Sequence, residues 1–326
     1  MAGPLRAGVI GASGVGKHHA KWFHALGCEV VAFAGTSAQS VAATETTLRD
    51  LFGFSGRGFV GVEPMLQAAG LDLVAICSPP WLHHEHFLRA VDAGCHILCE
   101  KPVVWDATKD TVQLVDEAAQ MVGLAREKGL VAAVNTQYVA ARAPYISLCA
   151  EAGREVDPEG FRRFFMQMDS RGGQYGATGE KVWIDLAPHP IGVLAAFAGP
   201  GTMRPASAAC RITDRQAQAV FSYLPADGGR EIAAEVVTCN VPEGPLVRRF
   251  GIDGVFCDYE GRNDEAGAYC AYLKLDGVEV KATDFVQTSI GRFVGAVRGE
   301  GEPLATLEAG LSNLEIQLRL LDIGRG

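Results

Sequence analysis

The sequence predicts an α/β fold in two parts, a parallel sheet flanked by helices and then a mostly antiparallel sheet. Short apolar runs alternate with helix-like segments up to Asn135, which is the pattern of βαβ units. After residue 206, strand-like runs are separated by turn signals such as Asp253-Gly254 and Asp276-Gly277, which is typical of antiparallel neighbours. The length of 326 residues is also that of two domains.

The individual elements follow from apolar periodicity and from the turn residues between them. The first part is expected to hold strands over 5–10, 29–34, 71–77, 96–99 and 131–135, and helices over 17–26, 37–51, 84–93 and 108–128. The last of these helices precedes Gly129, a residue type favoured just beyond a helix end. The second part is expected to hold strands that include 161–169, 216–223, 231–239 and 268–275, and helices over 181–197, 285–297 and 304–321.

The composition argues against several classes of protein. The 29 Lys and Arg residues against 38 Asp and Glu give a net charge of -9, so no general basic field attracts nucleic acid. No run of about 20 apolar residues predicts a membrane span, and no secretory signal precedes the first expected strand. The nine cysteines form no Cys-x-x-Cys pair. We therefore expect a cytoplasmic protein with reduced thiols and without structural zinc.

A glycine-rich loop follows the first expected strand and precedes a helix. Such a loop lets the backbone approach a pyrophosphate at the N-terminus of the helix. The loop departs from the pattern Gly-x-Gly-x-x-Gly because a serine occupies the position of the middle glycine. The alternative to a dinucleotide-binding loop is a tight turn that binds no ligand. The residues expected to bind a dinucleotide are Gly11, Ser13, Gly14, Val15 and Gly16.

The end of the second expected strand bears on the choice of coenzyme. An Asp or Glu there usually binds the adenosine ribose, but this strand runs into Gly35-Thr36-Ser37. Without a carboxylate, a 2′-phosphate is not repelled, and the Thr36 and Ser37 hydroxyls could donate hydrogen bonds to it, although no arginine is adjacent. We therefore expect NADP in preference to NAD. The alternative is a simple strand-to-helix turn, with the coenzyme selected elsewhere.

Two motifs follow the next pair of strands in fixed order: Ser78-Pro79-Pro80-Trp81-Leu82-His83, and then Ala93-Gly94-Cys95-His96 leading to Glu100-Lys101-Pro102. With them the chain resembles the glucose–fructose oxidoreductase / inositol dehydrogenase / MocA (Gfo/Idh/MocA) family. The resemblance implies a Rossmann dinucleotide-binding domain over 1–135. It further implies an α/β domain over 136–326, with a large, mostly antiparallel open sheet for substrate and subunit contacts. The helix over 304–321 is a candidate to pack back on the first domain.

The family consists mostly of NAD(P)-dependent oxidoreductases of sugars, cyclitols and related alcohols. The resemblance places Lys101 beside the nicotinamide, where its ammonium can stabilise alkoxide-like charge on the reacting oxygen. Pro102 would fix the backbone beyond it, with a cis bond as one way to do so. The alternative for Lys101 is a surface ion pair with Glu100. The other residues that the resemblance places near the coenzyme are Ser78, Pro79, His83, Glu100 and Asn135.

A second catalytic segment, Asp185-Leu-Ala-Pro188-His189-Pro190, matches the Asp-x-x-x-His pattern of the family. Residues four apart share a helix face, so both side chains could face Lys101. The resemblance implies that His189 is the acid/base and that Asp185 orients the substrate. The prolines suit a first helical turn, where the helix dipole disfavours a cationic imidazole. The alternative is that Asp185 only caps a helix and that His189 is only a buried packing residue. Gly192 replaces an aspartate that is frequent in the family. The resemblance therefore predicts the identity of the substrate less directly than the class of reaction.

Several other polar residues carry weaker predictions. His83, His84 and His86 cluster without a matching carboxylate or cysteine set, so no metal site is expected, and His84 and His86 are predicted to be exposed on a helix. His19 matches a common family histidine and is predicted to pack within its helix. Trp81 could wall the nicotinamide pocket or simply pack. Residues of a glycine-rich loop that could reach substrate are Arg171, Gln174 and Tyr175.

The leading functional hypothesis is hydride transfer between NADP or NAD and a hydroxyl or keto group of a sugar, cyclitol or related polyol. One alternative is an NAD-dependent glycosidase with tightly bound coenzyme. The other is a non-catalytic regulator that binds the coenzyme, against which the presence of Lys101, Asp185 and His189 counts. Relatives pair through the open sheet face, so the resemblance also implies a homodimer or homotetramer, without nucleic-acid or membrane partners.

Overall fold

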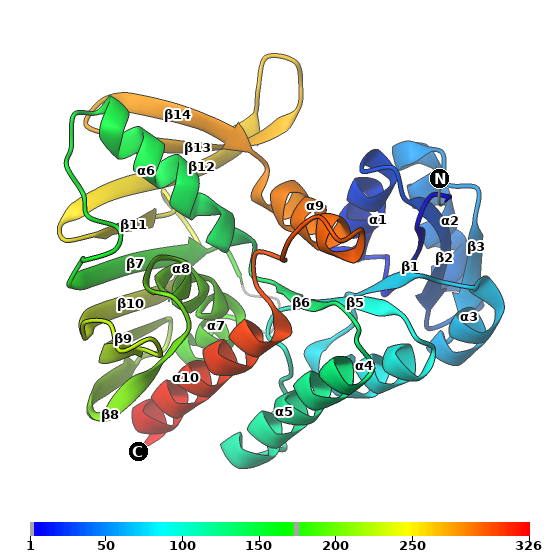
Figure 1. Cartoon of the computed structure of the whole chain (residues 1–326), viewed down its shortest axis with the longest axis horizontal. Coiled ribbons are helices and arrows are strands. Elements are labelled where there is room, and N and C mark those ends of the chain that lie inside the picture. Colours follow the sequence, from blue (N-terminus) through cyan, green and yellow to red (C-terminus); the bar gives the residue numbers. More distant parts are fainter. Residues whose placement is uncertain (1–2, 173–175) are drawn as a thin grey trace. The chain divides into compact units, whose positions relative to one another are not determined.

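The computed structural model describes residues 3–172 and 176–326 and forms two compact units (Figure 1). The first unit comprises Met1–Asn135 together with Val286–Leu311, and the second comprises Thr136–Phe285 together with Ser312–Gly326. The C-terminal helix α10 (Leu307–Arg325) therefore begins in the first unit and continues in the second.

The first unit is built on a parallel sheet of six strands in the order β3-β2-β1-β4-β5-β6. The chain reverses direction across the sheet between β1 and β4, and ligands of such sheets bind at the carboxyl ends of the strands next to this point. The strands are β1 (Arg6–Ile10), β2 (Glu29–Gly35), β3 (Arg57–Val60), β4 (Leu73–Ile76), β5 (His96–Glu100) and β6 (Ala132–Asn135).

Helices cover both faces of this sheet. One face carries α1 (Gly16–Ala25), α2 (Ala38–Phe52) and α9 (Phe285–Val297), whose Phe23, Leu48 and Phe293 are fully buried in one core. Burying each such side chain stabilises the fold by about 1.5–3 kcal/mol. The other helices of the unit are α3 (Val62–Ala69), the short 3₁₀ helix η1 (Pro80–Leu82), α4 (His83–Asp92) and α5 (Thr111–Glu127).

The second unit contains an eight-stranded sheet in the order β14-β13-β12-β11-β7-β10-β9-β8. Only β7 and β10 pair in parallel; the other neighbours are antiparallel. Asp253-Gly254 and Asp276-Gly277 have positive φ, as tight hairpin turns require. The strands are β7 (Arg163–Ser170), β8 (Gly201–Ile212), β9 (Gln216–Pro225), β10 (Ile232–Asn240), β11 (Arg248–Ile252), β12 (Val255–Asn263), β13 (Tyr269–Leu275) and β14 (Val278–Thr283).

Helices pack on one face of this second sheet. They are the 3₁₀ helix η2 (Gln137–Ala141), α6 (Arg142–Glu151), α7 (Gly179–Leu186) and α8 (Pro188–Ala198). Phe164, Met166 and Met168 alternate along β7 and are buried on that face, whereas Val220 and Phe256 are exposed. The sheet is therefore covered on one side and open on the other within this unit.

The fold class expected from the sequence is confirmed, because the parallel sheet precedes a mostly antiparallel one. The prediction missed β3, α3, α6 and the 3₁₀ helices η1 and η2, and it gave no bounds for β8, β11, β12 and β14. The expected helix over 181–197 consists of two helices that meet at Ala187, whose φ of -58° and ψ of -29° are themselves helical. The predicted segment is thus correct in position but divided in two.

Candidate active site

The glycine loop contains two kinds of glycine. Gly11 has a φ of +85°, and a Cβ on it would lie 2.8 Å from the Cys77 carbonyl oxygen, while a Cβ on Gly16 would lie 2.5 Å from the Gly11 carbonyl oxygen. The backbone itself therefore requires glycine at both positions. A Cβ on Gly14 would meet no atom within 4 Å. At Gly14 the fold leaves space that a ligand can use.

The loop ends at an uncapped helix N-terminus. Val15 is the N-cap residue of α1 and no side chain caps the helix there. Ser13, Gly14 and Val15 are exposed, whereas Gly16 is buried. N–H groups of a first helical turn that lack a capping side chain are a general binding site for anions. The loop therefore offers an uncapped helix N-terminus to an anion such as the pyrophosphate of a dinucleotide.

Thr36 and Ser37 lie between the end of β2 and the start of α2, and both are exposed. The Ser37 hydroxyl caps α2 by accepting a 3.2 Å hydrogen bond from the Ser40 amide. No carboxylate follows β2 before α2 begins. A 2′-phosphate here would meet a helix N-terminus and two hydroxyls without electrostatic repulsion.

The loop after β4 is held by two histidines. The His83 ring is 1% exposed; its Nε2 lies 2.8 Å from the Ser78 carbonyl oxygen and its Nδ1 lies 3.0 Å from the Pro102 carbonyl oxygen. Burial lowers the pKa of His83, and a neutral ring donates to one of these acceptors at a time. His83 thus joins the loop at Ser78-Pro79 to the loop that follows Lys101.

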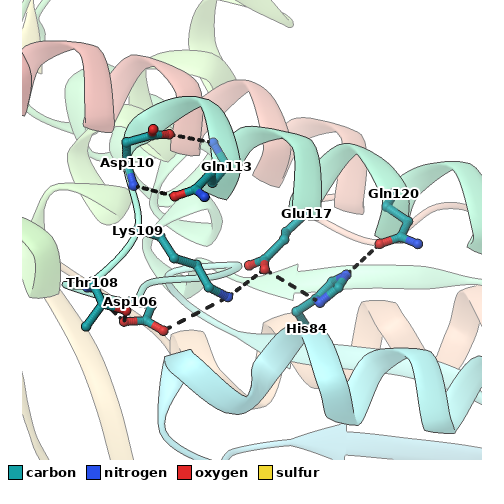
Figure 2. A network of polar contacts seen from close by, with 8 residues as sticks. All are labelled: His84, Asp106, Thr108, Lys109, Asp110, Gln113, Glu117 and Gln120. Atoms are coloured by element: carbon teal, nitrogen blue, oxygen red, sulfur yellow. Dashed lines mark hydrogen bonds and ion pairs between the residues drawn. The ribbon is translucent and has the colours of Figure 1, made fainter.

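The prediction that His84 and His86 are exposed is wrong. Both are half-buried, because α4 packs against neighbouring elements along this side. His86 Nδ1 lies 2.9 Å from the Ser78 Oγ, and burial lowers the pKa of His86. His84 joins a polar network with α5 (Figure 2), in which its Nε2 lies 2.8 Å from Gln120 Oε1. These histidines hold elements together.

No metal centre is formed by the described residues. Within 3–172 and 176–326, no three His, Cys, Asp or Glu side chains gather in a way that could hold an ion. The nine cysteines are free thiols. The polar network around His84 instead contains a lysine, with Lys109 Nζ 2.5 Å from Glu117 Oε1 (Figure 2).

The carboxyl ends of β5 and β6 form a buried polar cluster. Glu100 ends β5 and Asn135 ends β6, and the Asn135 amide donates a 2.7 Å hydrogen bond to Glu100 Oε1. His19 of α1 lies 2.7 Å from the same oxygen through its Nε2. His19 was predicted to pack within its helix. Its ring packs edge-on against Phe23 of α1 and also contacts a carboxylate 81 positions away in sequence.

Lys101 follows this cluster directly. Its side chain is half-buried, its amide donates a 3.3 Å hydrogen bond to Glu100 Oε2, and the Lys101–Pro102 bond is cis. Glu100 itself is 7% exposed, so its carboxylate lies beneath the surface. Lys101 therefore stands at the carboxyl edge of the same sheet that carries the glycine loop.

In the second unit, Asp185 lies in the last turn of α7 and His189 in the first turn of α8. Both are buried, at 7% and 6% exposure. Side chains of α10 hold this junction: Asn313 donates a 2.7 Å hydrogen bond to the Pro188 carbonyl, and Gln317 donates a 2.9 Å hydrogen bond to the Ile184 carbonyl. The two predicted catalytic residues are thus fixed on a braced helix junction.

Gly192, three residues after His189, lies against η2. A Cβ there would approach Val139 Cγ2 to 3.3 Å and Thr136 Cβ to 3.4 Å. A side chain at this position would need Val139 to shift by a few tenths of an ångström. Gly192 therefore lies in close packing between α8 and η2.

Aromatic residues around His189 were not predicted from the sequence. The Tyr138 ring packs edge-on against His189 with centroids 4.9 Å apart, and against Tyr259 at 5.1 Å. Tyr259 stacks on Phe285 at 5.4 Å, and the Arg248 guanidinium lies 5.9 Å from the Tyr259 centroid. These residues come from distant segments, so the only sequence signal was an aromatic residue shortly after β6.

The other predicted contacts have separate outcomes. Arg171 is exposed and donates a 2.6 Å hydrogen bond to the Gly244 carbonyl, while Gln174 and Tyr175 lie outside the described residues. Trp81 is 54% exposed, so it does not simply pack in the core.

Comparisons with known proteins agree with this arrangement. Residues 5–136 match the Gfo/Idh/MocA model, described as an oxidoreductase family with an NAD-binding Rossmann fold. The chain is 25% identical to 1,5-anhydro-D-fructose reductase of Ensifer adhaerens, over 97% of this chain and 95% of that protein. It is 33% identical to D-glucoside 3-dehydrogenase of Escherichia coli K12, but over only 40% of this chain and 34% of that protein.

A solved structure extends the likeness in fold over the whole chain. UDP-N-acetylglucosamine 3-dehydrogenase GnnA from Acidithiobacillus ferrooxidans aligns with a TM-score of 0.73 and 20% identity, covering 99% of this chain and 98% of that one. Residues 5–136 therefore carry the NAD-binding Rossmann domain of the Gfo/Idh/MocA family. The chain is an NAD(P)-dependent enzyme of the dehydrogenase and reductase class. None of its described helices combines the length and the apolar character needed to span a bilayer.

Proposed function

We propose that the protein transfers hydride between NADP and a hydroxyl or keto group of a sugar, cyclitol or related polyol. The observation that carries this proposal is the shared sheet edge of the first unit, where Lys101 follows β5 and the open glycine loop follows β1. The relatives named above support the substrate class, because one is a reductase of an anhydrosugar and another a dehydrogenase of glucosides.

Three side chains of the protein have different roles in the proposed reaction. Bound coenzyme supplies the centre that accepts or returns the hydride. The Lys101 ammonium donates a hydrogen bond to the substrate oxygen and stabilises negative charge as it develops there. His189 takes the hydroxyl proton during oxidation and returns it during reduction. Asp185 accepts a hydrogen bond from a neighbouring substrate hydroxyl and so orients the sugar.

The two parts of the chain have separate roles in this proposal. Residues 1–135 form the dinucleotide-binding domain, and the glycine loop, Thr36, Ser37, Ser78, Pro79, His83, Glu100 and Asn135 provide or support the coenzyme site. The second unit, Thr136–Phe285 together with Ser312–Gly326, forms the domain for substrate and for subunit contacts. NADP is favoured over NAD because the loop after β2 offers two exposed hydroxyls and no carboxylate.

Coenzyme and sugar screening tests the function. At coenzyme concentrations about 100-fold above Kd, binding stabilises the folded state by about 2.7 kcal/mol, which raises Tm by about 5–10 °C for a unit of this size. We expect a larger shift with NADPH than with NADH, and absorbance changes at the nicotinamide band with at least one polyol of a panel. Absence of any shift with either coenzyme at millimolar concentration would contradict the proposal.

We also propose that a second copy of the chain covers the open face of the eight-stranded sheet. This face carries a hollow of about 540 Å³, and its lining includes Arg163, Glu235, Val220 and Phe256. Val220 and Phe256 are about 40% exposed, at 42% and 39%, and contiguous exposed apolar surface of this kind marks interaction sites. An arginine and a glutamate on one face can also pair reciprocally across a two-fold axis.

Light scattering after size exclusion tests this interface. A Val220→Asp, Phe256→Glu double variant is expected to run at the monomer mass, because two buried unpaired carboxylates oppose association. The wild type is expected at twice or four times that mass. The matched control is Val112→Asp, on an exposed part of α5, which should leave the mass unchanged. A monomeric wild type would refute the interface.

A further inference from the structure

A buried charged network links the helix after the glycine loop to the residue before Lys101. His19, Glu100 and Asn135 are 0%, 7% and 1% exposed. Glu100 Oε1 lies 2.7 Å from His19 Nε2 and 2.7 Å from Asn135 Nδ2, and the two donors are themselves 3.4 Å apart. Two polar side chains, one from α1 and one from β6, thus converge on one carboxylate oxygen at the end of β5.

The carboxylate in this network is ionised at neutral pH. Burial alone would raise the pKa of Glu100, but the hydrogen bond and charge of His19, the hydrogen bond of Asn135 and the charge of Lys101 lower it to about 2. An ionised carboxylate only accepts hydrogen bonds, so His19 Nε2 carries the hydrogen that it donates to Glu100. The remaining titratable groups that face Glu100 are Cys77, Cys99 and His83.

The other carboxylate oxygen leads to Lys101. Glu100 Oε2 accepts the backbone N–H of Lys101 at 3.3 Å, so a fixed carboxylate also fixes the backbone from which the Lys101 side chain departs. His19 lies one turn into α1, whose first residue is Gly16 of the glycine loop. The contacts therefore run from the helix beside the proposed dinucleotide site to the proposed catalytic lysine.

Packing alone does not account for this cluster. A buried charge is costly unless it is paired and hydrogen-bonded, and replacing such a network by apolar side chains of similar volume is often neutral or stabilising. Moreover, His19 Nδ1 and Asn135 Oδ1 have no hydrogen-bond partner among the described residues. The site thus holds more polar groups than its own internal hydrogen bonds use.

We propose that His19 is a positioning residue for hydride transfer: together with Asn135 it holds the Glu100 carboxylate, which fixes the backbone of Lys101 and so aims the ammonium at the substrate oxygen. The inference rests on the function proposed above. It adds a role for a histidine that does not itself touch the reacting atoms. It also means that the helix at the glycine loop and the catalytic lysine are held in one rigid arrangement.

Paired substitutions at His19 test this role. Leu fills a similar volume without a donor, whereas Gln can place an N–H near the Nε2 position. Displacement of a catalytic group by about 1 Å can lower turnover by about 10²-fold. We expect His19→Leu to lower kcat by roughly 10- to 100-fold with the KM for coenzyme within about 2-fold, and His19→Gln to recover kcat to within about 3-fold of wild type.

The matched control is His24→Leu, which makes the same replacement at an exposed position of α1 and should leave kcat unchanged. If His19→Leu does not fold, Asn135→Ala removes the other donor to Glu100 and should lower kcat, in addition to any rise in the KM for coenzyme that follows from its place in the coenzyme site. The inference is overturned if the folded His19→Leu enzyme keeps its kcat, if Gln fails to rescue it, or if Asn135→Ala changes only the KM for coenzyme.

The failure of this inference differs from the failure of the proposed function. If wild type shows no coenzyme-dependent rise in Tm and no turnover with any polyol, the function itself is wrong. If wild type is active and the His19 variants behave like His24→Leu, only the positioning role is wrong.

Discussion

Replacing Lys101 with Met is expected to lower turnover by about 10²–10⁴-fold, the usual contribution of a positioned acid/base or charge-stabilising group. Met keeps most of the aliphatic length and removes the ammonium, so the substrate oxygen loses its hydrogen-bond donor as negative charge develops. Steady-state kcat with the best polyol of the panel measures the loss. The rise in Tm with coenzyme should persist, because the glycine loop is unchanged.

Lys109→Met is the matched control. Lys109 also belongs to the first unit, but it pairs with Glu117 at 2.5 Å and with Asp106 at 4.0 Å in the network of Figure 2. Its side chain is 30% exposed, and surface pairs of this kind stabilise a protein by about 0–1 kcal/mol. Its kcat should therefore remain within about 2-fold of wild type. Full activity of Lys101→Met would show that the Glu100-Lys101-Pro102 motif serves only to bind coenzyme.

The elements that the sequence predicted well are those whose signals are local. β1 and β2 are apolar runs bounded by glycine, and α9 spans the predicted residues 285–297. The missed elements lack such signals. β3 has four residues, of which only Phe59 is buried, and it is held by pairing with β2. α3 and α6 are short and carry Pro64 and Pro144 within their first turns, where proline is compatible with a helix but obscures its start.

The residues of the candidate site also differ in whether a local sequence signal reveals them. Gly11 and Gly16 are required by the local backbone, so a motif could reveal them. His19 could not be distinguished from a packing histidine, because its partner Glu100 is brought to it only by the parallel pairing of the sheet. The aromatic residues around His189 come together from η2, β12 and the start of α9. No spacing in the sequence reports contacts of that kind.

Replacing Trp183 with Ala is expected to destabilise the second unit by about 3–5 kcal/mol, the usual cost of removing a large aromatic side chain from a core. Trp183 is fully buried in α7. Its Nε1 donates a 3.0 Å hydrogen bond to the Gln317 carbonyl, and Gln317 Nε2 lies 3.3 Å from the Trp183 carbonyl in return. The Trp183 side chain thus holds α7 against the later part of α10. Trp183 lies two residues before Asp185 in α7.

Differential scanning calorimetry measures the effect. At about 2–4 °C per kcal/mol for a unit of this size, Tm should fall by about 6–20 °C. Trp183→Phe is the matched variant: it keeps an aromatic ring and loses the N–H donor, so it should cost about 1–3 kcal/mol, mostly from the hydrogen bond and the smaller volume. A loss below about 1 kcal/mol for Trp183→Ala would mean that the α7–α10 contact does not hold the helix that carries Asp185. A large loss would instead indicate that the helix carrying Asp185, the proposed substrate-orienting residue, depends on packing against the C-terminal helix.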